Sequence, residues 1–420
     1  MFNLSLNFLK NIKNLIFPFY RNKDLKFIFK KLQDGTLDNK IAARFVGGCV
    51  RKYLSNEKID DIDIATILTT DQIKEKFKDT NFKVIDTGVK HGTVTIVSEN
   101  YKVELTTLRK DVETDGRHAK VEYTDDWKKD SERRDFTINA IYMDINGKLF
   151  DPQMGTVDLK NRNIKFIGDP QKRIEEDYLR IIRFIRFKIM YDVSVEPTTS
   201  NAIKQNLDGI KKISKERILI ELLKILGLKT FLKINKGGSL REIFSMVFPE
   251  FLYLKRLERL EKVYQYSEVN LDILLAVLLI DEKDNHEYFI HKYNPPNKIK
   301  EILRKFNKNL KELKNDKKFF EKDLMKNVYS HGKNHLVALN LINFSINSKV
   351  KSNDFSETLN KILKTTVPIF PIDGETLKQK GMQEGQSLGS VLKTLEKEWI
   401  NNNFEISNER VDEIIKVNSN

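Results

Sequence analysis

Two acidic residues at alternate positions, Asp61 and Asp63, carry the clearest chemical signal in this sequence. The apolar residues Ile62 and Ile64 alternate with them, which is the period of a half-buried β-strand. Both carboxylates therefore leave the strand on the same face, where they could hold a pair of divalent metal ions. The simple alternative is that Asp60, Asp61 and Asp63 form a surface turn, because a short acidic motif is a weak signal by itself.

A segment suited to phosphates lies just upstream of the acidic pair. Gly47 and Gly48 have no Cβ, so the backbone between them can approach a triphosphate closely. Arg51 adds a fixed positive charge for the same phosphates. Together with Asp61 and Asp63, this segment predicts nucleotidyl transfer.

Glu104 is a third acidic residue in a stretch of alternating polarity. Beside Asp61 and Asp63 it would complete a two-metal site. In such a site one ion lowers the pKa of an attacking 3′-hydroxyl, and the other holds the triphosphate and the leaving pyrophosphate. Carboxylate oxygens suit Mg²⁺, which keeps several waters and takes few protein ligands. We therefore expect Mg²⁺ as the cofactor.

Two further stretches are rich in arginine. In the first, Arg133 and Arg134 precede Asp135 and Asn139, a set that offers contacts to a triphosphate and a sugar, although it could simply begin a charged helix. The second runs from Arg173 to Arg186. There the residues at steps of three form a ridge that winds slowly around one helix: Asp177, Arg180, Arg183 and Arg186.

The plain interpretation of this ridge is an Asp–Arg salt bridge of small value. Phe184 and Phe187 flank the arginines, however, and such neighbours are poorly placed for a purely solvated face. A cleft that receives an anion explains the arginines better.

These motifs must be positioned by a mixed α/β segment over residues 40–150 and by helices from Asp169 to the end of the chain. Strands are expected at Ala43–Val46, Asp61–Ala65, Thr93–Val97, Lys102–Thr106 and Ile141–Asp144. Helices are expected from Gly48, from Asp71 with Thr70 or Asp71 as the cap, and over Ile174–Ile189, Ile218–Leu226 and Asn297–Leu313. The polar segment from Arg109 to His118 has no apolar period and predicts a mobile loop. The lysine-rich segment Lys308–Lys326 predicts a solvated helix face, and Leu4–Tyr20 an N-terminal helix.

The chain has 420 residues, which is typical of two to four domains, and its formal charge is +14. This charge favours a polyanionic partner, with nucleic acid ahead of an anionic membrane, although a codon bias toward lysine is an equal alternative. The single cysteine, Cys49, cannot form an internal disulfide, so we expect a reducing cytoplasm. No apolar run reaches the roughly 18 residues of a membrane span.

In this order, the motifs resemble the class II tRNA nucleotidyltransferases. These CCA-adding enzymes belong to the polymerase-β-like superfamily, which also includes bacterial poly(A) polymerases. The resemblance is strong over Ala43–Leu226. Weaker similarity to the family's tRNA-binding tail is found at Gly374–Leu377, Gly381–Gly389 and Glu396–Phe404. It implies an α+β fold with a catalytic head (1–150), a nucleotide-selecting helical neck (151–228), a helical body (229–345) and a tRNA-binding tail (346–420).

The resemblance also implies roles for individual residues. Asp61 and Asp63 would bind Mg²⁺, and Glu104 would be the third catalytic carboxylate. The nucleotide-binding residues would be Gly48, Arg51, Arg134, Asp135, Asn139, Asp177, Arg180, Arg183 and Arg186. The implied partners are tRNA, CTP and ATP, with no membrane and no stable protein partner.

The choice of nucleotide can be argued from hydrogen-bonding capacity. Asp177 accepts hydrogen bonds and Arg180 donates them. Cytosine and adenine both present an amino donor next to a ring-nitrogen acceptor, which an Asp–Arg pair matches. Uracil and guanine present the reversed pattern. In the family the loop around Arg109 to His118 assists the switch to adenosine, so its presence here predicts full CCA addition.

Two other functions remain open at this point. A poly(A) polymerase shares the same head, but the segment from Phe82 to Val97 lacks the basic Gly-Arg-Arg-Phe-like stretch typical of that branch. A tRNA-binding protein with a decayed head is the second alternative, and the acidic residues speak against it. The sequence departs from the family at Lys52, where an acidic or amide residue is usual, and at Glu384 and Gln386, where prolines are common.

Overall fold

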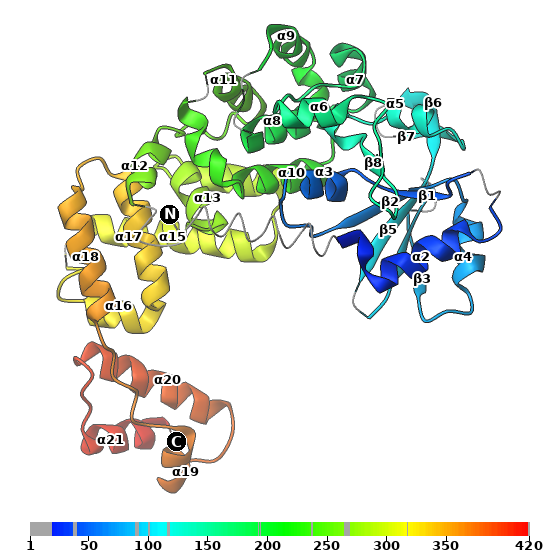
Figure 1. The fold of residues 1–420 in the computed structure, drawn as a ribbon. Helices are drawn as coiled ribbons and strands as arrows, with labels where there is room; N and C mark the ends of the chain where they lie inside the picture. The colour runs from blue at the N-terminus through cyan, green and yellow to red at the C-terminus, as the bar shows by residue number, and fades with distance from the viewer. Residues whose placement is uncertain are drawn as a thin grey trace, which may run out of the picture. The chain divides into compact units, whose positions relative to one another are not determined.

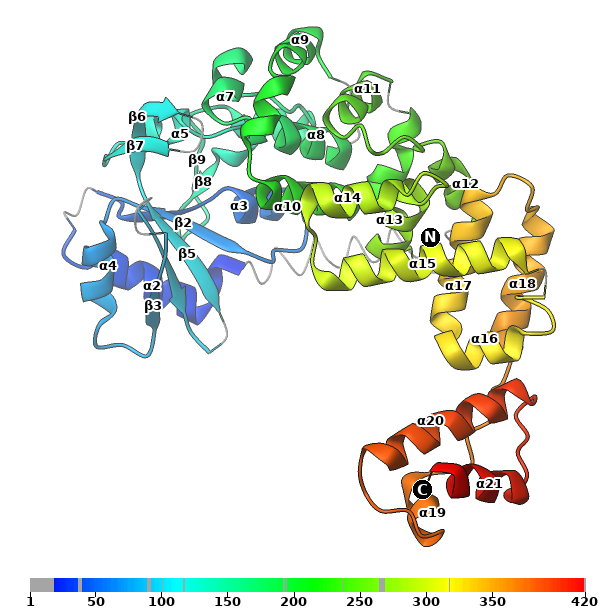
Figure 2. The same ribbon diagram turned by 180° about the vertical axis from the view of Figure 1, so that it is seen from behind.

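A computed structural model describes residues 19–36, 40–88, 92–99, 101–115, 118–191, 193, 195–236, 238–263, 269–316 and 318–418. The chain divides into two compact units, of which the first reaches Pro249 and the second begins at Glu250. The first unit combines a mixed sheet with helices, and the second is helical (Figure 1, Figure 2). This confirms the α+β class. The finer four-part division stays a prediction, because the contacts separate only two units.

The first unit is built on a seven-stranded sheet with the strand order β3-β4-β5-β2-β1-β8-β9. Only β2 and β5 are parallel neighbours. The strands are β1 (Ala43–Val46), β2 (Ile62–Thr66), β3 (Lys83–Gly88), β4 (Thr93–Val97), β5 (Lys102–Thr107), β8 (Tyr142–Met143) and β9 (Leu149–Phe150). All five expected strands are confirmed, with ends shifted by at most one residue. β3 and β9 were not expected; they lie at the sheet edges and are largely exposed, so they lack an apolar alternation.

One face of the sheet carries the apolar core. The helices α2 (Lys23–Gln33), α3 (Gly48–Leu54) and α4 (Thr70–Phe77) pack their buried side chains there against Ile62 and Ile64 of β2. Asp63 lies between these two isoleucines in the strand, so its side chain leaves on the opposite face. The core thus fixes the direction in which the acidic side chains point.

The start of α4 differs slightly from the expectation. The N-cap is Thr69, not Thr70 or Asp71. The Thr69 hydroxyl accepts a hydrogen bond from the Gln72 amide at 3.3 Å, and the Gln72 side chain accepts one from the Thr69 amide at 2.9 Å. This reciprocal capping box was overlooked because its threonine lies one residue earlier.

The polar segment from Arg109 to His118 is not a loop, so that prediction is wrong. It belongs to a separate two-stranded ribbon made of β6 (Arg109–Asp115) and β7 (His118–Tyr123), with a register shift between Asp111 and Glu113. An ion pair of 2.9 Å joins Lys110 to Glu122 across the strands. The two strands satisfy each other's backbone groups, so a ribbon forms without the apolar alternation on which the prediction relied.

Two of the remaining helices of the first unit precede β8 in the chain, and the others follow β9 (blue-green to green in Figure 1). Together they comprise α5 (Trp127–Glu132), η3 (Thr137–Asn139), α6 (Gly155–Lys160), α7 (Pro170–Glu176), α8 (Leu179–Tyr191), α9 (Pro197–Gln205), η4 (Leu207–Lys212), α10 (Lys215–Leu226), η5 (Lys229–Lys236) and α11 (Gly238–Val247); the short η1 (Phe19–Arg21) precedes the sheet. The expected continuous helix over Ile174–Ile189 is broken at Asp177, whose φ of −155° and ψ of 104° are extended. Tyr178 follows in the break, and its ring lies so close to Gly209 that a Cβ there would approach it to 2.0 Å.

The second unit consists of helices only, among its described residues. They are α12 (Arg256–Val263), α13 (Leu271–Leu279), α14 (Asn285–Tyr293), α15 (Asn297–Asn315), α16 (Leu324–His331), α17 (Lys333–Ile346), α18 (Ser352–Lys364), α19 (Gly374–Gln379), α20 (Gln386–Asn401) and α21 (Asn408–Asn418). The last three share their own apolar core around Leu377 and Leu395. Within the described ranges, no helix has the length and apolar character needed to cross a membrane.

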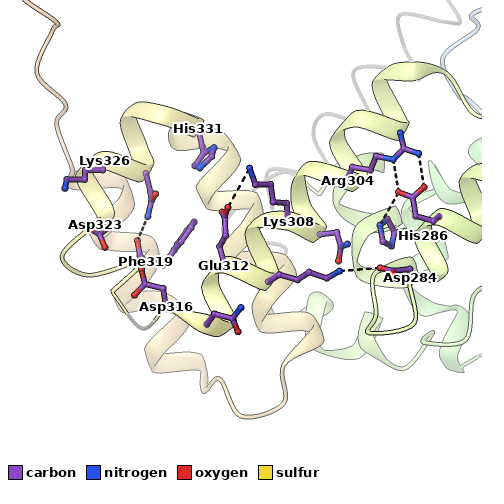
Figure 3. Close-up of a pocket in the computed structure, with 15 residues that line it drawn as sticks. Asp284, His286, Arg304, Lys308, Glu312, Asp316, Phe319, Asp323, Lys326 and His331 are labelled. Carbon is purple, nitrogen blue, oxygen red and sulfur yellow. Dashed lines mark hydrogen bonds and ion pairs between the residues drawn. The ribbon is translucent and has the colours of Figure 1, made fainter. Parts of the chain in front are cut away.

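The segment Lys308–Lys326 is not one solvated helix face. α15 ends at Asn315, and the following turns bury Phe319 and Phe320 before α16 begins. A cavity of about 840 Å³ lies here between α14, α15 and α16 (Figure 3). Three of its cations, Arg304, Lys308 and Lys311, are paired with Glu287, Glu312 and Asp284, whereas Lys326 donates to the carbonyl of Asn401. Most of the positive charge of this lining is therefore already paired with carboxylates.

Candidate active site

The acidic residues occupy two neighbouring strands of the sheet. Asp63 on β2 lies directly opposite Glu104 on β5 in the parallel register, and Asp61 comes immediately before β2. Adjacent strands are about 4.8 Å apart, so the two in-register carboxylates share one small area on the face opposite the core. Glu104 and Asp61 are exposed, whereas Asp63 is half-buried.

Crowding and burial act together on Asp63. Burial raises its pKa, Glu104 and Asp61 raise it further, and the positive charges of Arg134 and Arg51 offset only part of this, so that the pKa is about 6. Negative charge concentrated in this way is suited to a divalent cation. Among the described residues, no group of three or more His, Cys, Asp or Glu side chains is arranged to hold a metal ion without other ligands. Mg²⁺ takes few protein ligands when water and phosphate supply the others, so the donor set fits this ion.

A stability experiment tests this crowding. In metal-free protein, Asp63→Asn should raise the free energy of unfolding at pH 7 by up to about 3 kcal/mol, because the folded state disfavours the Asp63 carboxylate. The folded pKa is raised, so the destabilisation is fully present above pH 6 and disappears as the pH falls toward the unfolded value near 4. Denaturant unfolding of both proteins in EDTA, at pH 7 and pH 4, measures the difference. If the wild type and Asp63→Asn had the same free energy of unfolding at pH 7 as well as at pH 4, the raised pKa of Asp63 would be contradicted.

The glycine pair lies against this acidic face. Gly47 has a φ of 73°, which favours glycine, and a Cβ there would lie 3.6 Å from Oδ2 of Asp63. A Cβ on Gly48, the first residue of α3, would meet nothing within 4 Å, so the space above it is open. The backbone of this turn can therefore receive a group from solvent beside Asp63. The Cys49 thiol that follows is buried and donates to the carbonyls of Val46 and Asp63 at 3.3 and 3.5 Å.

A chain of hydrogen bonds connects four of the predicted nucleotide-binding residues. Arg51 of α3 donates from Nη1 to Oδ1 of Asn139. The Asn139 amide donates to Oδ1 of Asp135 at 2.9 Å, and Arg183 of α8 donates from Nε to Oδ2 of Asp135 at 2.8 Å. Burial raises the pKa of Asp135, but Arg183 and Asn139 outweigh it and hold the pKa below its usual value. The carboxylate therefore stays charged and fixes both neighbours.

Phe187 joins the same group from α8. Its ring is buried, and the guanidinium groups of Arg51 and Arg186 lie 4.8 and 4.4 Å from the ring centroid. Such cation–π contacts stabilise both cations in a desolvated place. Arg186 also pairs with the buried Glu221 of α10 at 2.7 Å. Arg51 and Arg186, both predicted to bind the nucleotide, thus lie against the same aromatic ring.

Arg134 is held from a different direction. Its Nη2 pairs with Oδ2 of Asp130 at 3.0 Å, and its Nε donates to the Tyr142 hydroxyl at 3.0 Å. The positive charge of Arg134 also favours the charged form of Asp63 and so lowers the pKa of that carboxyl. The charge of Arg134 therefore acts on the acidic site, while the buried Asp130 holds its guanidinium in place.

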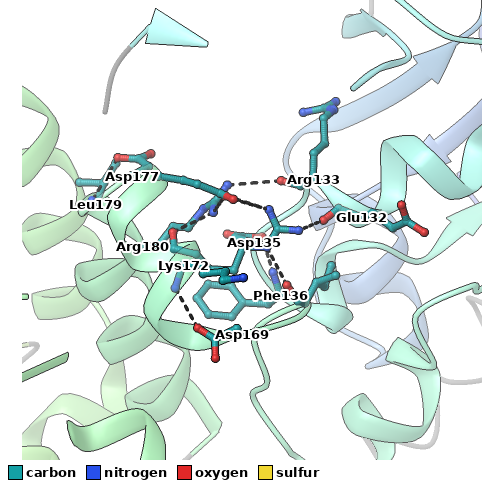
Figure 4. Close-up of polar contacts among 12 residues, drawn as sticks. Glu132, Arg133, Asp135, Phe136, Asp169, Lys172, Asp177, Leu179 and Arg180 are labelled. Carbon is teal, nitrogen blue, oxygen red and sulfur yellow. Dashed lines mark hydrogen bonds and ion pairs between the residues drawn. The ribbon is translucent and has the colours of Figure 1, made fainter. Parts of the chain in front are cut away.

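Asp177 and Arg180 do not pair with each other, so the Asp–Arg salt bridge that was the plain alternative for this ridge is not formed (Figure 4). Arg180 donates from Nη1 to Glu176 at 2.5 Å and from Nη2 to the carbonyl of Arg133 at 3.3 Å. Asp177 instead accepts from Arg217 of α10 at 2.9 Å and from the Leu179 amide at 3.1 Å. Asp177 caps α8 from outside the helix, so it does not belong to the helical ridge of arginines.

Each arginine of the ridge thus has a carboxylate partner: Glu176 for Arg180, Asp135 for Arg183 and Glu221 for Arg186. Three partners of predicted site residues were not singled out from sequence: Asp130, which pairs with Arg134, Arg217, which pairs with Asp177, and Glu221, which pairs with Arg186. Asp130 could have been found, because it lies three and four residues before Arg133 and Arg134 on a helix. Arg217 and Glu221 carry no local signal, since their contacts depend on how α10 packs on α8.

A mixed sheet with in-register acidic residues beside a glycine turn, flanked by converging arginines, defines the nucleotidyltransferase class. Residues 43–165 match the family model for the poly A polymerase head domain, and residues 192–237 match the one described as the probable RNA and SrmB-binding site of polymerase A. The chain belongs to the CCA tRNA nucleotidyltransferase family, the CCA-adding enzymes.

The relatives span nearly the whole chain. The mitochondrial CCA tRNA nucleotidyltransferase 1 of Danio rerio is 32% identical over 395 residues, which cover 89% of this chain and 86% of that protein. The CCA-adding enzyme of Lactobacillus helveticus is 29% identical over 391 residues, covering 89% and 92%. The structure of the Bacillus stearothermophilus CCA-adding enzyme in complex with CTP has a TM-score of 0.68 at 25% identity and covers 94% of this chain and 96% of that one. These similarities confirm the family resemblance seen in the motifs.

Proposed function

We propose that this protein adds or repairs the 3′-terminal CCA of tRNA from CTP and ATP without a nucleic-acid template. The single observation that carries the proposal is the in-register pair Asp63 and Glu104 beside the open turn at Gly48. Membership of the CCA-adding family supplies the substrate class. In the reaction, the tRNA 3′-hydroxyl attacks the α-phosphate of the nucleotide, and pyrophosphate leaves.

Mg²⁺ is the proposed cofactor, and Asp61 and Asp63 would hold it, with Glu104 as the third carboxylate. When bound, such ions lower the pKa of the attacking hydroxyl and stabilise the charge on the pyrophosphate. The chain itself orients the nucleotide. The backbone at Gly48 leaves room for the phosphates, and Arg51 and Arg134 supply positive charge from two sides.

The neck residues are proposed to choose the base. Asp177 and Arg180 retain their roles as acceptor and donor, but each is already held by a neighbour, Arg217 and Glu176 respectively. These contacts fix both side chains before the base arrives, which lowers the entropy cost of recognition. Asp135, Asn139, Arg183 and Arg186 are proposed to contact the nucleotide from the connected group around Phe187.

The tail and the location of the protein complete the proposal. The core shared by α19, α20 and α21 would present the tail to tRNA, with the N-terminus of α20 at Gly385 available to a phosphate. A reducing compartment, the cytoplasm, is consistent with a single buried cysteine.

An end-sequencing assay tests the function. Purified protein and Mg²⁺ are incubated with tRNA lacking its 3′ CCA, with each nucleotide offered alone and with CTP and ATP together. We expect two cytidines and one adenosine, followed by a stop. A long adenosine tail would instead establish a poly(A) polymerase, and tRNA binding without any addition would establish a binding protein.

A further inference from the structure

Asp130 is a carboxylate without any exposed surface at which two consecutive arginines meet. Its Oδ1 accepts hydrogen bonds from Nε and Nη2 of Arg133 at 2.8 and 2.6 Å. Its Oδ2 accepts from Nε and Nη2 of Arg134 at 3.2 and 3.0 Å and from the Tyr142 hydroxyl at 2.7 Å. These bonds occupy the acceptor positions of both oxygens, so Asp130 has no capacity left for a substrate.

The charges of this cluster do not balance. One carboxylate faces two guanidinium groups, and the side chains of Arg133 and Arg134 are only 14% and 16% exposed. A partly buried excess of positive charge is costly unless an anion compensates it. The Asp63 carboxylate offsets part of this excess, because the charge of Arg134 also acts on it. An arriving polyphosphate would supply further negative charge beside Arg134.

The cluster is also tied to the ribbon and to the neck. The Arg109 amide, at the start of β6, donates to Oδ1 of Asp130 at 3.3 Å, and the Arg109 carbonyl accepts from Nε of Arg133 at 3.1 Å. The carbonyl of Arg133 in turn accepts from Arg180 (Figure 4). Asp130 therefore contacts the start of the β6–β7 ribbon and the side chains of Arg133 and Arg134. Through the Arg133 backbone it is also connected to Arg180.

We propose that Asp130 is a positioning residue, which holds the Arg134 guanidinium toward the phosphates of the incoming nucleotide and anchors the base of the β6–β7 ribbon to it. This inference rests on the proposed function, since it assumes that a nucleotide binds beside Asp63. Asp130 acts through Arg134 and does not touch the nucleotide.

Asp130→Asn keeps the side-chain volume but removes the charge, and one of its two positions then presents a donor to an arginine. We expect the KM for CTP to rise about 10- to 100-fold, with a smaller change in kcat. Without the Asp130 charge, Arg134 would no longer be held in place for its charge-assisted contact with the phosphates. Tyr142→Phe removes the hydroxyl that donates to the same oxygen and accepts from Nε of Arg134, without changing any charge, and it should raise the KM about two- to tenfold. CMP incorporation into tRNA lacking CCA gives both constants, and competition by a non-reacting CTP analogue gives nucleotide affinity without turnover.

A double-mutant cycle separates positioning from a general loss of structure. If Asp130 acts through Arg134, Asp130→Asn should add almost nothing to the KM of Arg134→Met. The matched control is Asp158→Asn. Asp158 is also buried and accepts from the Thr137 hydroxyl at 2.8 Å, but it faces no arginine of the site, so this variant should lose stability and keep its KM.

The outcomes decide the proposal. Equal effects of Asp130→Asn in the wild-type and Arg134→Met backgrounds would overturn it. If Asp130→Asn does not fold, Tyr142→Phe decides alone, and an unchanged KM and analogue affinity in that variant would overturn the proposal. Failure of the wild-type protein to incorporate CMP would instead refute the proposed function, and this is measured first.

Discussion

Asp63→Ala is expected to reduce CMP incorporation by about a thousandfold or more while leaving tRNA binding largely intact. Asp63 lies at the centre of the acidic face, opposite Glu104 in the sheet and 3.6 Å from the position a Gly47 Cβ would take. Losing its carboxylate would remove a ligand of the proposed ion, and transition-state charge stabilisation is commonly worth a factor of that size. Single-turnover incorporation of labelled CTP and a filter-binding assay with tRNA measure the two effects.

Asp60→Asn is the matched control for this experiment. Asp60 belongs to the same acidic stretch but forms an exposed ion pair of 3.0 Å with Lys52. Exposed pairs of this kind contribute little, so incorporation should stay within about twofold of the wild type. Retained turnover in Asp63→Ala, or an equal loss in Asp60→Asn, would remove Asp63 from the metal site.

Arg180→Ala should weaken the choice of base, with discrimination of CTP against UTP falling about 10- to 100-fold. A site built to hydrogen-bond a base rejects the wrong one because buried polar groups are then left unpaired, and truncating the donor removes that penalty. Asp177→Ala should act in the same direction. It should also loosen the start of α8, because Asp177 accepts from the Leu179 amide. The measurement is kcat/KM for each of the four nucleotides on tRNA ending before CCA.

Two further variants test whether Arg180 itself contacts the base: Glu176→Gln, which removes the charge of its partner, and Asp208→Asn as a control. Glu176 holds Arg180 without being proposed to contact the base, so Glu176→Gln should lower discrimination less than Arg180→Ala does. Asp208 on η4 forms an exposed ion pair with Lys211, and its substitution should leave selectivity unchanged. Unchanged selectivity in both Arg180→Ala and Asp177→Ala would exclude these residues from base choice.

The sequence predicted those parts of the site that depend on local periodicity. Alternation with Ile62 and Ile64 placed Asp61 and Asp63 on one face, and the structure has Asp63 on the face opposite the core. It could not predict that β2 and β5 would be neighbours, because no local pattern states which strands pair. That pairing alone brings Glu104 opposite Asp63.

Contacts between elements account for most of what was missed. The partners of Arg186 and Asp177 both come from α10, which is far along the chain and reaches them only through helix packing. The β6–β7 ribbon escaped detection for the opposite reason, since the backbones of its two strands pair with each other although β6 has no apolar alternation in sequence. Asp177 was misplaced in a helix because the apolar stripe continues across the break, although the backbone does not.

The buried thiol beside Asp63 makes the chain convenient for fluorescence work. Burial raises the pKa of Cys49 to about 11, so at neutral pH almost none of it is thiolate, the form that reacts with maleimide dyes. It is the chain's only cysteine. New cysteines on the β6–β7 ribbon and on α20 could therefore take a donor and an acceptor dye without removal of the native residue, and energy transfer would then follow the ribbon and the tail through successive additions.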